Sequence, residues 1–154
     1  MIQINATRAA GATVVLMLAR WEHYEHDADI GVRGFGTTQA EAFEQAATAM
    51  TAAVTDPLTV RPLEEIALGC EAPDKELLLA EWLNALVEEM ATRRMLFSRF
   101  EVRVEGARLR ARAWGEALDA RRHRPAAEVK GATDTTLRVA RHDDGWLAQT
   151  VIDI

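Results

Sequence analysis

The stretch LFSRFEVRVEGARLRARA, residues 96–113, indicates the fold class more clearly than any other part of the chain. From Phe100 to Ala113 apolar residues alternate with charged ones, which is typical of a β-strand with one buried face. Gly106-Ala107 interrupts the alternation, and a two-residue interruption of this kind is typical of a tight hairpin turn. Residues 96–113 therefore predict two antiparallel strands with one face toward a core.

The other face of this hairpin is rich in arginine. Five arginines would share it, namely Arg99, Arg103, Arg108, Arg110 and Arg112. Such a stripe could bind phosphates, but Glu101 and Glu105 are interleaved with it, and no aromatic residue stands among the arginines to stack bases. A solvated surface with charges paired across strands is therefore the favoured interpretation.

Shorter segments predict the remaining strands. Residues 21–36 indicate two strands that reverse direction around Asp27-Ala28-Asp29, and the other candidates are residues 64–71, 128–132, 136–142 and 146–154. Asp143-Asp144-Gly145 joins the last two, and these residue types favour a turn.

Two segments between the strands repeat their apolar residues at helical spacing. The first follows Thr38-Gln39-Ala40-Glu41, a capping box in which the threonine and the glutamate satisfy early amides. The second follows Asp74, whose residue type favours a helix cap, and carries a wide apolar stripe from Leu78 to Met90, which indicates deep packing. The predicted fold is an α+β two-layer sandwich, in which a mostly antiparallel β-sheet carries two main helices on one face.

Length and composition indicate one ordinary domain. The chain has 154 residues, of which 49% are hydrophobic, and this is enough for one core. We expect residues 21–154 to form that domain. Residues 1–20 are expected to be an N-terminal extension, which is disordered, adds an edge strand, or precedes a true start at Met17.

Charge and cysteine content limit the functional classes. A net charge of −6 argues against direct nucleic-acid binding. The apolar run from Ala12 to Ala19 is too short to span a membrane, and a single cysteine, Cys70, allows no internal disulfide, so a cytoplasmic protein is expected. Residues 21–95 hold 15 acidic and five basic residues, which indicates either a solvated surface or an acidic face for a cationic partner.

Acidic residues at the two extremities of the predicted domain suggest a metal site. Asp27 and Asp29 stand near its start, Asp153 is its last charged side chain, and the carboxylate of Ile154 follows. If the first and last strands pair, each close pair of carboxylates costs roughly 3–4 kcal/mol, and a hard cation would remove that cost. The alternatives are that the aspartates are turn residues and that the end is frayed.

Nearby histidines add little to this hypothesis. His23 and His26 are three residues apart, but no cysteine and no third nitrogen ligand accompany them, so a zinc site is disfavoured. His26 is expected to orient a carboxylate through a hydrogen bond or to have a structural role. No nucleophile or general base stands out anywhere in the chain, and catalysis is not expected.

Several segments, in this order, resemble the archease family over residues 21–154. They are WEHYEHDADIG (21–31), AEAFE (40–44), EWLN (81–84), LFSRF (96–100), AWGE (113–116), EVK (128–130) and the ending VIDI (151–154). The chain departs from the family pattern in two places. Asp27 stands where threonine is usual, and Asp134-Thr135 stands where tyrosine and histidine are common.

The resemblance implies a function as well as a fold. Archeases are non-catalytic partners of the RtcB-type RNA ligase of tRNA splicing, which promote ligase guanylylation and multiple turnover. The implied metal ligands are Asp29, Asp153 and the terminal carboxylate of Ile154, with His26 and Asp27 as extra ligands or supporting neighbours. Calcium is the expected cation, with magnesium or manganese as alternatives. The rival interpretation is a chaperone-like binding module that assists RNA-modifying enzymes.

Overall fold

The computed structural model describes residues 6–9, 12–15 and 18–154 of the chain. Its elements form an α+β fold in which every strand pair is antiparallel. The strands divide into two main sheets and one separate two-stranded sheet. The predicted fold class is confirmed, and the division into two main sheets is a detail that the sequence pattern did not reveal.

The first main sheet holds both ends of the predicted domain. Its five strands are β3 (Arg20–His26), β4 (Asp29–Gly36), β8 (Gly131–Ala132), β9 (Arg138–His142) and β10 (Gly145–Asp153). β4 and β10 are neighbours and pair over seven residues, from Gly36 opposite Trp146 to Ile30 opposite Ile152. The last strand of the chain therefore lies beside one of the first.

The second main sheet is the arginine-rich hairpin with one more strand. β6 (Met95–Glu105) and β7 (Arg108–Ala117) form the hairpin, and β5 (Glu64–Glu71) pairs with the other edge of β7. Gly106 lies in the connecting turn with φ +59°, a conformation that glycine adopts without a steric cost. Ser98 is an extra residue in β6, because the pairing shifts between Phe97 and Arg99, as at a β-bulge.

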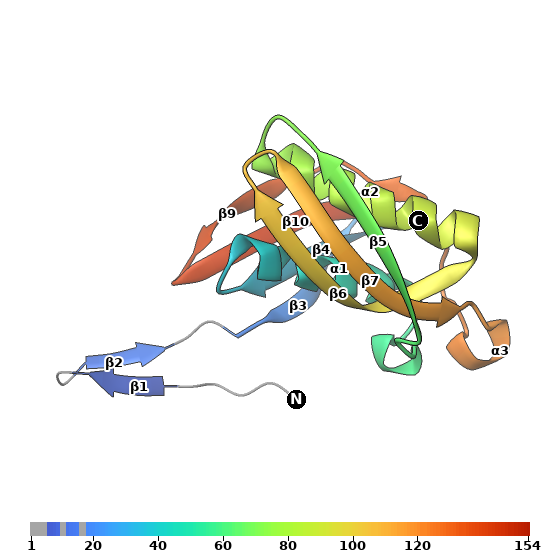
Figure 1. Cartoon of the computed structure of the whole chain (residues 1–154), viewed down its shortest axis with the longest axis horizontal. Coiled ribbons are helices and arrows are strands. Elements are labelled where there is room, and N and C mark those ends of the chain that lie inside the picture. The colour runs from blue at the N-terminus through green and yellow to red at the C-terminus, as the bar shows by residue number, and fades with distance from the viewer. Residues whose placement is uncertain (1–5, 10–11, 16–17) are drawn as a thin grey trace.

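Two long helices form the core with these sheets. α1 (Gln39–Val54) contacts β4 and β10 of the first sheet as well as β6 of the second, and α2 (Lys75–Arg93) packs mainly on β5 (Figure 1). The indole N–H of Trp82 in α2 donates to the carbonyl of Phe43 in α1 at 3.0 Å. Both rings are completely buried, so this hydrogen bond joins the helices inside the core.

The predicted helix caps are confirmed in detail. Thr38 accepts a hydrogen bond from the amide of Glu41 at 3.1 Å. The Glu41 carboxylate reaches back to the amide of Thr37 at 2.8 Å, one residue before the N-cap that a standard capping box would use. Asp74 accepts from the amide of Leu77 at 2.8 Å. Two short helices complete this part of the fold, the 3₁₀ helix η1 (Pro57–Thr59) and α3 (Ala120–His123).

Two expectations about the ends of strands need correction. Residues 128–130 are not part of a strand, because only 131 and 132 pair with β10, and the pairing of β9 begins at Arg138 and not at Thr136. Thr136 has φ +52°, which is incompatible with an extended strand.

The N-terminal segment is only partly described. β1 (Ala6–Ala9) and β2 (Ala12–Val15) pair with each other, while residues 1–5, 10–11 and 16–17 lie outside the described part of the chain. The prediction of an extension over residues 1–20 therefore stays a prediction. In the described part of the chain, neither long helix has an apolar run that could cross a bilayer.

Candidate functional site

The end of β10 meets the start of β4, and this junction brings two of the predicted ligands together. The last paired residues are Ile30 and Ile152, so Asp29 and Asp153 follow at the same end of the two strands. The backbone N–H of Ile154 donates to Oδ1 of Asp29 at 3.3 Å. Asp29, Asp153 and Ile154 are each only partly buried.

The β3–β4 hairpin supplies the two remaining predicted residues. His26 pairs directly with Asp29 across the hairpin, so both side chains lie on the same face of the sheet. Asp27 occupies the turn with φ +51°, and its side chain is 95% exposed. Its carboxylate lies 3.9 Å from Nδ1 of His26, so it faces that histidine from the solvent side.

Backbone contacts on the other side of β10 hold the junction in place. The amide of Lys130 donates to the carbonyl of Asp153 at 2.8 Å. Close by, the Asn84 side chain of α2 accepts from the amide of Ala132 at 2.9 Å. The last residues of β10 are therefore fixed between β4 and the segment that leads into β8, and the position of Asp153 is set by both neighbours.

The donor atoms at this junction suit a hard cation, although they are few. Among the residues that the structure describes, no group of three or more histidine, cysteine, aspartate or glutamate side chains could hold a metal ion. Asp29 and Asp153 supply two carboxylates, so the predicted set needs the carboxylate of Ile154 as its third anionic ligand. All three are oxygen donors, which is the chemistry that calcium, magnesium and manganese prefer.

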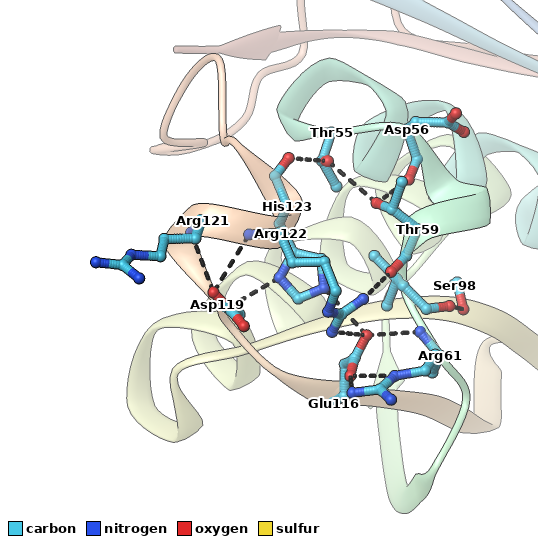
Figure 2. A network of polar contacts seen from close by, with 11 residues as sticks. Thr55, Asp56, Thr59, Arg61, Ser98, Glu116, Asp119, Arg121, Arg122 and His123 are labelled. Carbon is cyan, nitrogen blue, oxygen red and sulfur yellow. Dashed lines mark hydrogen bonds and ion pairs between the residues drawn. The ribbon is translucent and has the colours of Figure 1, made fainter.

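A second polar cluster, which the sequence pattern did not suggest, surrounds Glu116 near the end of β7 (Figure 2). The Glu116 side chain is 6% exposed and accepts from the Arg61 amide at 2.7 Å and from its guanidinium at 3.0 Å. Arg122 pairs at 2.5 Å with Oε2, the oxygen that also accepts from the Arg61 amide, and Nε2 of His123 lies 3.0 Å from the same oxygen. These contacts hold the pKa of Glu116 well below its usual range, and the hydrogen bond from Arg122 has the largest effect. They lower the pKa because they stabilise the charged form of the carboxyl group.

The protonation of His123 follows from its two neighbours. The amide of Asp119 donates to Nδ1 of His123 at 2.9 Å, so this nitrogen must be unprotonated. Nε2 therefore carries the hydrogen, and this N–H donates a hydrogen bond to the Glu116 carboxylate. The ring is completely buried, and both of its nitrogens have partners.

The Glu116 cluster ties together segments that are distant in the sequence. Arg122 donates to the carbonyl of Thr59 in η1, and the hydroxyl of Thr55 at the end of α1 donates to the carbonyl of His123 (Figure 2). No buried side-chain nitrogen or oxygen in the described part of the chain lacks a hydrogen-bond partner. The cluster is thus saturated by its own contacts, which suits a structural role better than a catalytic one.

Comparison with known proteins identifies the family. Residues 21–154 match the pattern of the Archease protein family. The chain is 42% identical to protein archease of Thermococcus gammatolerans and 39% identical to protein archease of Pyrococcus abyssi, in each case over 89% of this chain and 100% of the relative. The solution structure of Methanobacterium thermoautotrophicum protein 1598 superposes with a TM-score of 0.77 at 30% identity, covering 87% of this chain and 98% of that one. The predicted resemblance is confirmed, and the chain belongs to the Archease protein family.

Proposed function

We propose that this chain is a non-catalytic protein cofactor that activates an RtcB-type RNA ligase in tRNA splicing. In this role it promotes guanylylation of the ligase and multiple turnover. Two findings support the proposal, namely membership of the Archease protein family and the contact between Asp29 and Ile154 at the β4–β10 junction. The contact carries the proposal, because it joins the two ends of the domain where the predicted ligands stand.

The proposed site holds one divalent cation through Asp29, Asp153 and the carboxylate of Ile154. Calcium is the expected ion, and magnesium and manganese are the alternatives. Bound there, the ion would offset two of the three negative charges of the carboxylates, and its remaining coordination positions could take phosphate oxygens of the ligase complex. The protein orients the ligands: the Ile154 amide holds Oδ1 of Asp29, and His26 lies directly across the hairpin from Asp29.

Charge guides the proposed encounter with the ligase. Residues 21–95 carry 15 acidic against five basic residues, and a ligase that binds RNA and a nucleotide presents basic surfaces. Such complementarity mainly raises the association rate, and salt screens it. The stimulation of guanylylation should therefore weaken as the salt concentration rises.

A guanylylation assay with a purified RtcB-type ligase tests this proposal. The wild-type chain should increase the rate of guanylylation, and Asp29→Ala should stimulate it at least about tenfold less, since ligand charge sets cation affinity. The matched control is Asp144→Ala, which removes an exposed aspartate from the β9–β10 turn and should stimulate like wild type. Equal stimulation by wild type and Asp29→Ala would refute the role of this site.

Two further experiments separate the alternatives. A variant with residues appended after Ile154 moves the terminal carboxylate away, and it should lose cation affinity if that group is a ligand. A chaperone-like module, by contrast, would protect unrelated aggregating proteins as well as it assists the ligase. Equal activity toward such clients would favour that rival over the specific cofactor.

A further inference from the structure

The outer face of the second main sheet has four rows of side chains that run across β5, β7 and β6. Antiparallel pairing places the residues of a row directly opposite one another. Three of the rows combine arginine with an acidic or aromatic neighbour. They are Glu71–Arg108–Glu105, Ala67–Arg112–Glu101 and Glu65–Trp114–Arg99.

The fourth row differs from the others, because it has two arginines and no acid. Arg110 of β7 stands opposite Arg103 of β6 on one side and Gly69 of β5 on the other. Both arginines are exposed, and neither makes an ion pair or a side-chain hydrogen bond with another described residue. Like charges directly opposite each other destabilise a sheet, so this row is unfavourable in the free protein.

The surface beside this row is open. Gly69 has no side chain, and a Cβ placed on it would meet only the carbonyl oxygen of Leu109, at 3.0 Å. Together with Ala67 it leaves a depression of about 570 Å³, whose charged lining is Arg103, Arg110, Arg112 and Glu101. Three guanidinium groups and one carboxylate thus surround a space that is large enough for a small anion.

Of the other three arginines of the face, Arg108 and Arg99 have partners of their own. Arg108 pairs with Glu71 at 3.0 Å, and the guanidinium of Arg99 lies over the Trp114 ring, 4.4 Å from its centroid. Trp114, two residues after Arg112, thus stands on this face, so the expectation that no aromatic residue stands among the arginines was wrong, and Arg99 already covers the ring. A base therefore has no free ring to stack on, which disfavours single-stranded nucleic acid here.

We propose that Arg103 and Arg110, with Arg112 beside them, form a binding site for the phosphate group of a phosphate monoester. Guanidinium groups bind phosphate oxygens through paired hydrogen bonds, and a monoester dianion carries about −1.5 to −2 charges at neutral pH. That charge balances the two unpaired arginines of the row. The site lies on the second sheet, whereas the β4–β10 junction belongs to the first, so the two proposals are independent.

Titration with inorganic phosphate, followed by NMR of the ¹⁵N-labelled chain at constant ionic strength, tests the site. Saturable shifts are expected at the Arg103 and Arg110 side chains and at the Gly69 amide. Arg110→Gln should weaken binding at least about tenfold, because it removes one of the paired donors. The matched control Arg108→Gln removes the same charge from the same strand and should bind phosphate like wild type.

Stability without phosphate provides a second, independent test. In phosphate-free buffer Arg110→Gln should unfold at a higher temperature than wild type, since it removes the repulsion from Arg103, and Arg108→Gln should not. Destabilisation by Arg110→Gln in that buffer would overturn the geometry of the proposal. In the phosphate titration, an equal loss of affinity in Arg110→Gln and Arg108→Gln would refute the proposed site. NMR shifts that do not saturate and that occur at all arginines would refute it as well.

A third arm separates the sources of phosphate. Glycerol phosphate, a monoester, should bind at least as well as inorganic phosphate. A short RNA with 5′- and 3′-hydroxyl ends contains only diesters and should compete poorly with either. Tighter binding of that RNA than of both small ligands would replace the proposed monoester site by a nucleic-acid surface.

Discussion

Glu116→Gln is expected to destabilise the fold far more than an ordinary substitution at a strand end. The carboxylate accepts from the amide of Arg61, the guanidinium groups of Arg61 and Arg122, and the ring of His123. Glutamine keeps one acceptor oxygen, but it presents an NH₂ group where the carboxylate had its second acceptor. One of the surrounding donors therefore loses its partner and faces another donor.

The size of this effect follows from the same contacts. A hydrogen bond to a charged group contributes about 1.5–3 kcal/mol, against about 0.5–1.5 kcal/mol for a neutral one. The Arg61 side chain is 62% exposed and that of Arg122 is 34% exposed, so solvent screens part of their contribution. We expect a loss of about 3 kcal/mol, which lowers the melting temperature of a domain of this size by about 10 °C.

Thermal and denaturant unfolding as a function of pH would measure the effect. The folded state holds the pKa of Glu116 below its ordinary value. The stabilisation is therefore present above the pKa of the unfolded chain, about 4.3, and is lost as the pH falls toward the folded pKa. The difference between wild type and Glu116→Gln should be constant near neutral pH and shrink under acid conditions. A difference below about 1 kcal/mol at pH 7, or one that grows toward acid, would refute this reasoning.

Three further substitutions or measurements address other parts of the fold. Burial raises the pKa of Glu44, whose carboxylate accepts from the Val102 amide at 2.8 Å. Glu44→Gln should therefore keep this hydrogen bond, and the free energy of unfolding at pH 7 should stay unchanged or rise by up to ~1 kcal/mol. This gain should fade as the pH falls, because the wild-type carboxyl group then becomes neutral. Clear destabilisation of the variant in urea unfolding at pH 7 would contradict this. The Cβ of Gly34→Ala would lie 2.1 Å from the backbone oxygen of Ala42 in α1. This substitution should cost more than about 3 kcal/mol, and a melting temperature like that of wild type would be incompatible with the packing of α1 on β4. Burial raises the pKa of Cys70 to about 11. Alkylation of its thiol at pH 8 should therefore be about 100-fold slower than that of an exposed thiol, and it should reach the ordinary rate when urea unfolds the chain. Rapid alkylation of the folded chain would contradict this.

Local patterns in the sequence predicted much of the fold. The alternation in residues 96–113 predicted β6 and β7, and the caps at Thr38 and Asp74 predicted where α1 and α2 begin. These features depend on neighbouring residues alone, so they can be read from one chain. The division of the strands into two sheets depends on which distant segments pair, and no local pattern encodes it.

The β4–β10 junction and the Glu116 cluster also depend on contacts between distant segments. The β4–β10 junction joins residues separated by 125 positions, so its identification needed the resemblance to a family as well as the acidic residues. Glu116 lies opposite Leu96, just beyond the extra residue Ser98 that shifts the pairing of β6 with β7. The bulge lies in β6, so Glu116 keeps the parity of the exposed arginines of β7. Glu116 is buried because Arg61, Arg122 and His123 surround its carboxylate, and the period of two within β7 does not show such contacts with other segments.

Calcium titration by isothermal calorimetry tests the proposed junction site most directly. Wild type should bind one ion per chain, Asp144→Asn should bind it equally well, and Asp29→Asn should bind it at least about tenfold more weakly, since it removes one ligand charge. Unchanged affinity in Asp29→Asn, or no binding of calcium, magnesium or manganese by wild type, would contradict a cation held where β4 and β10 meet.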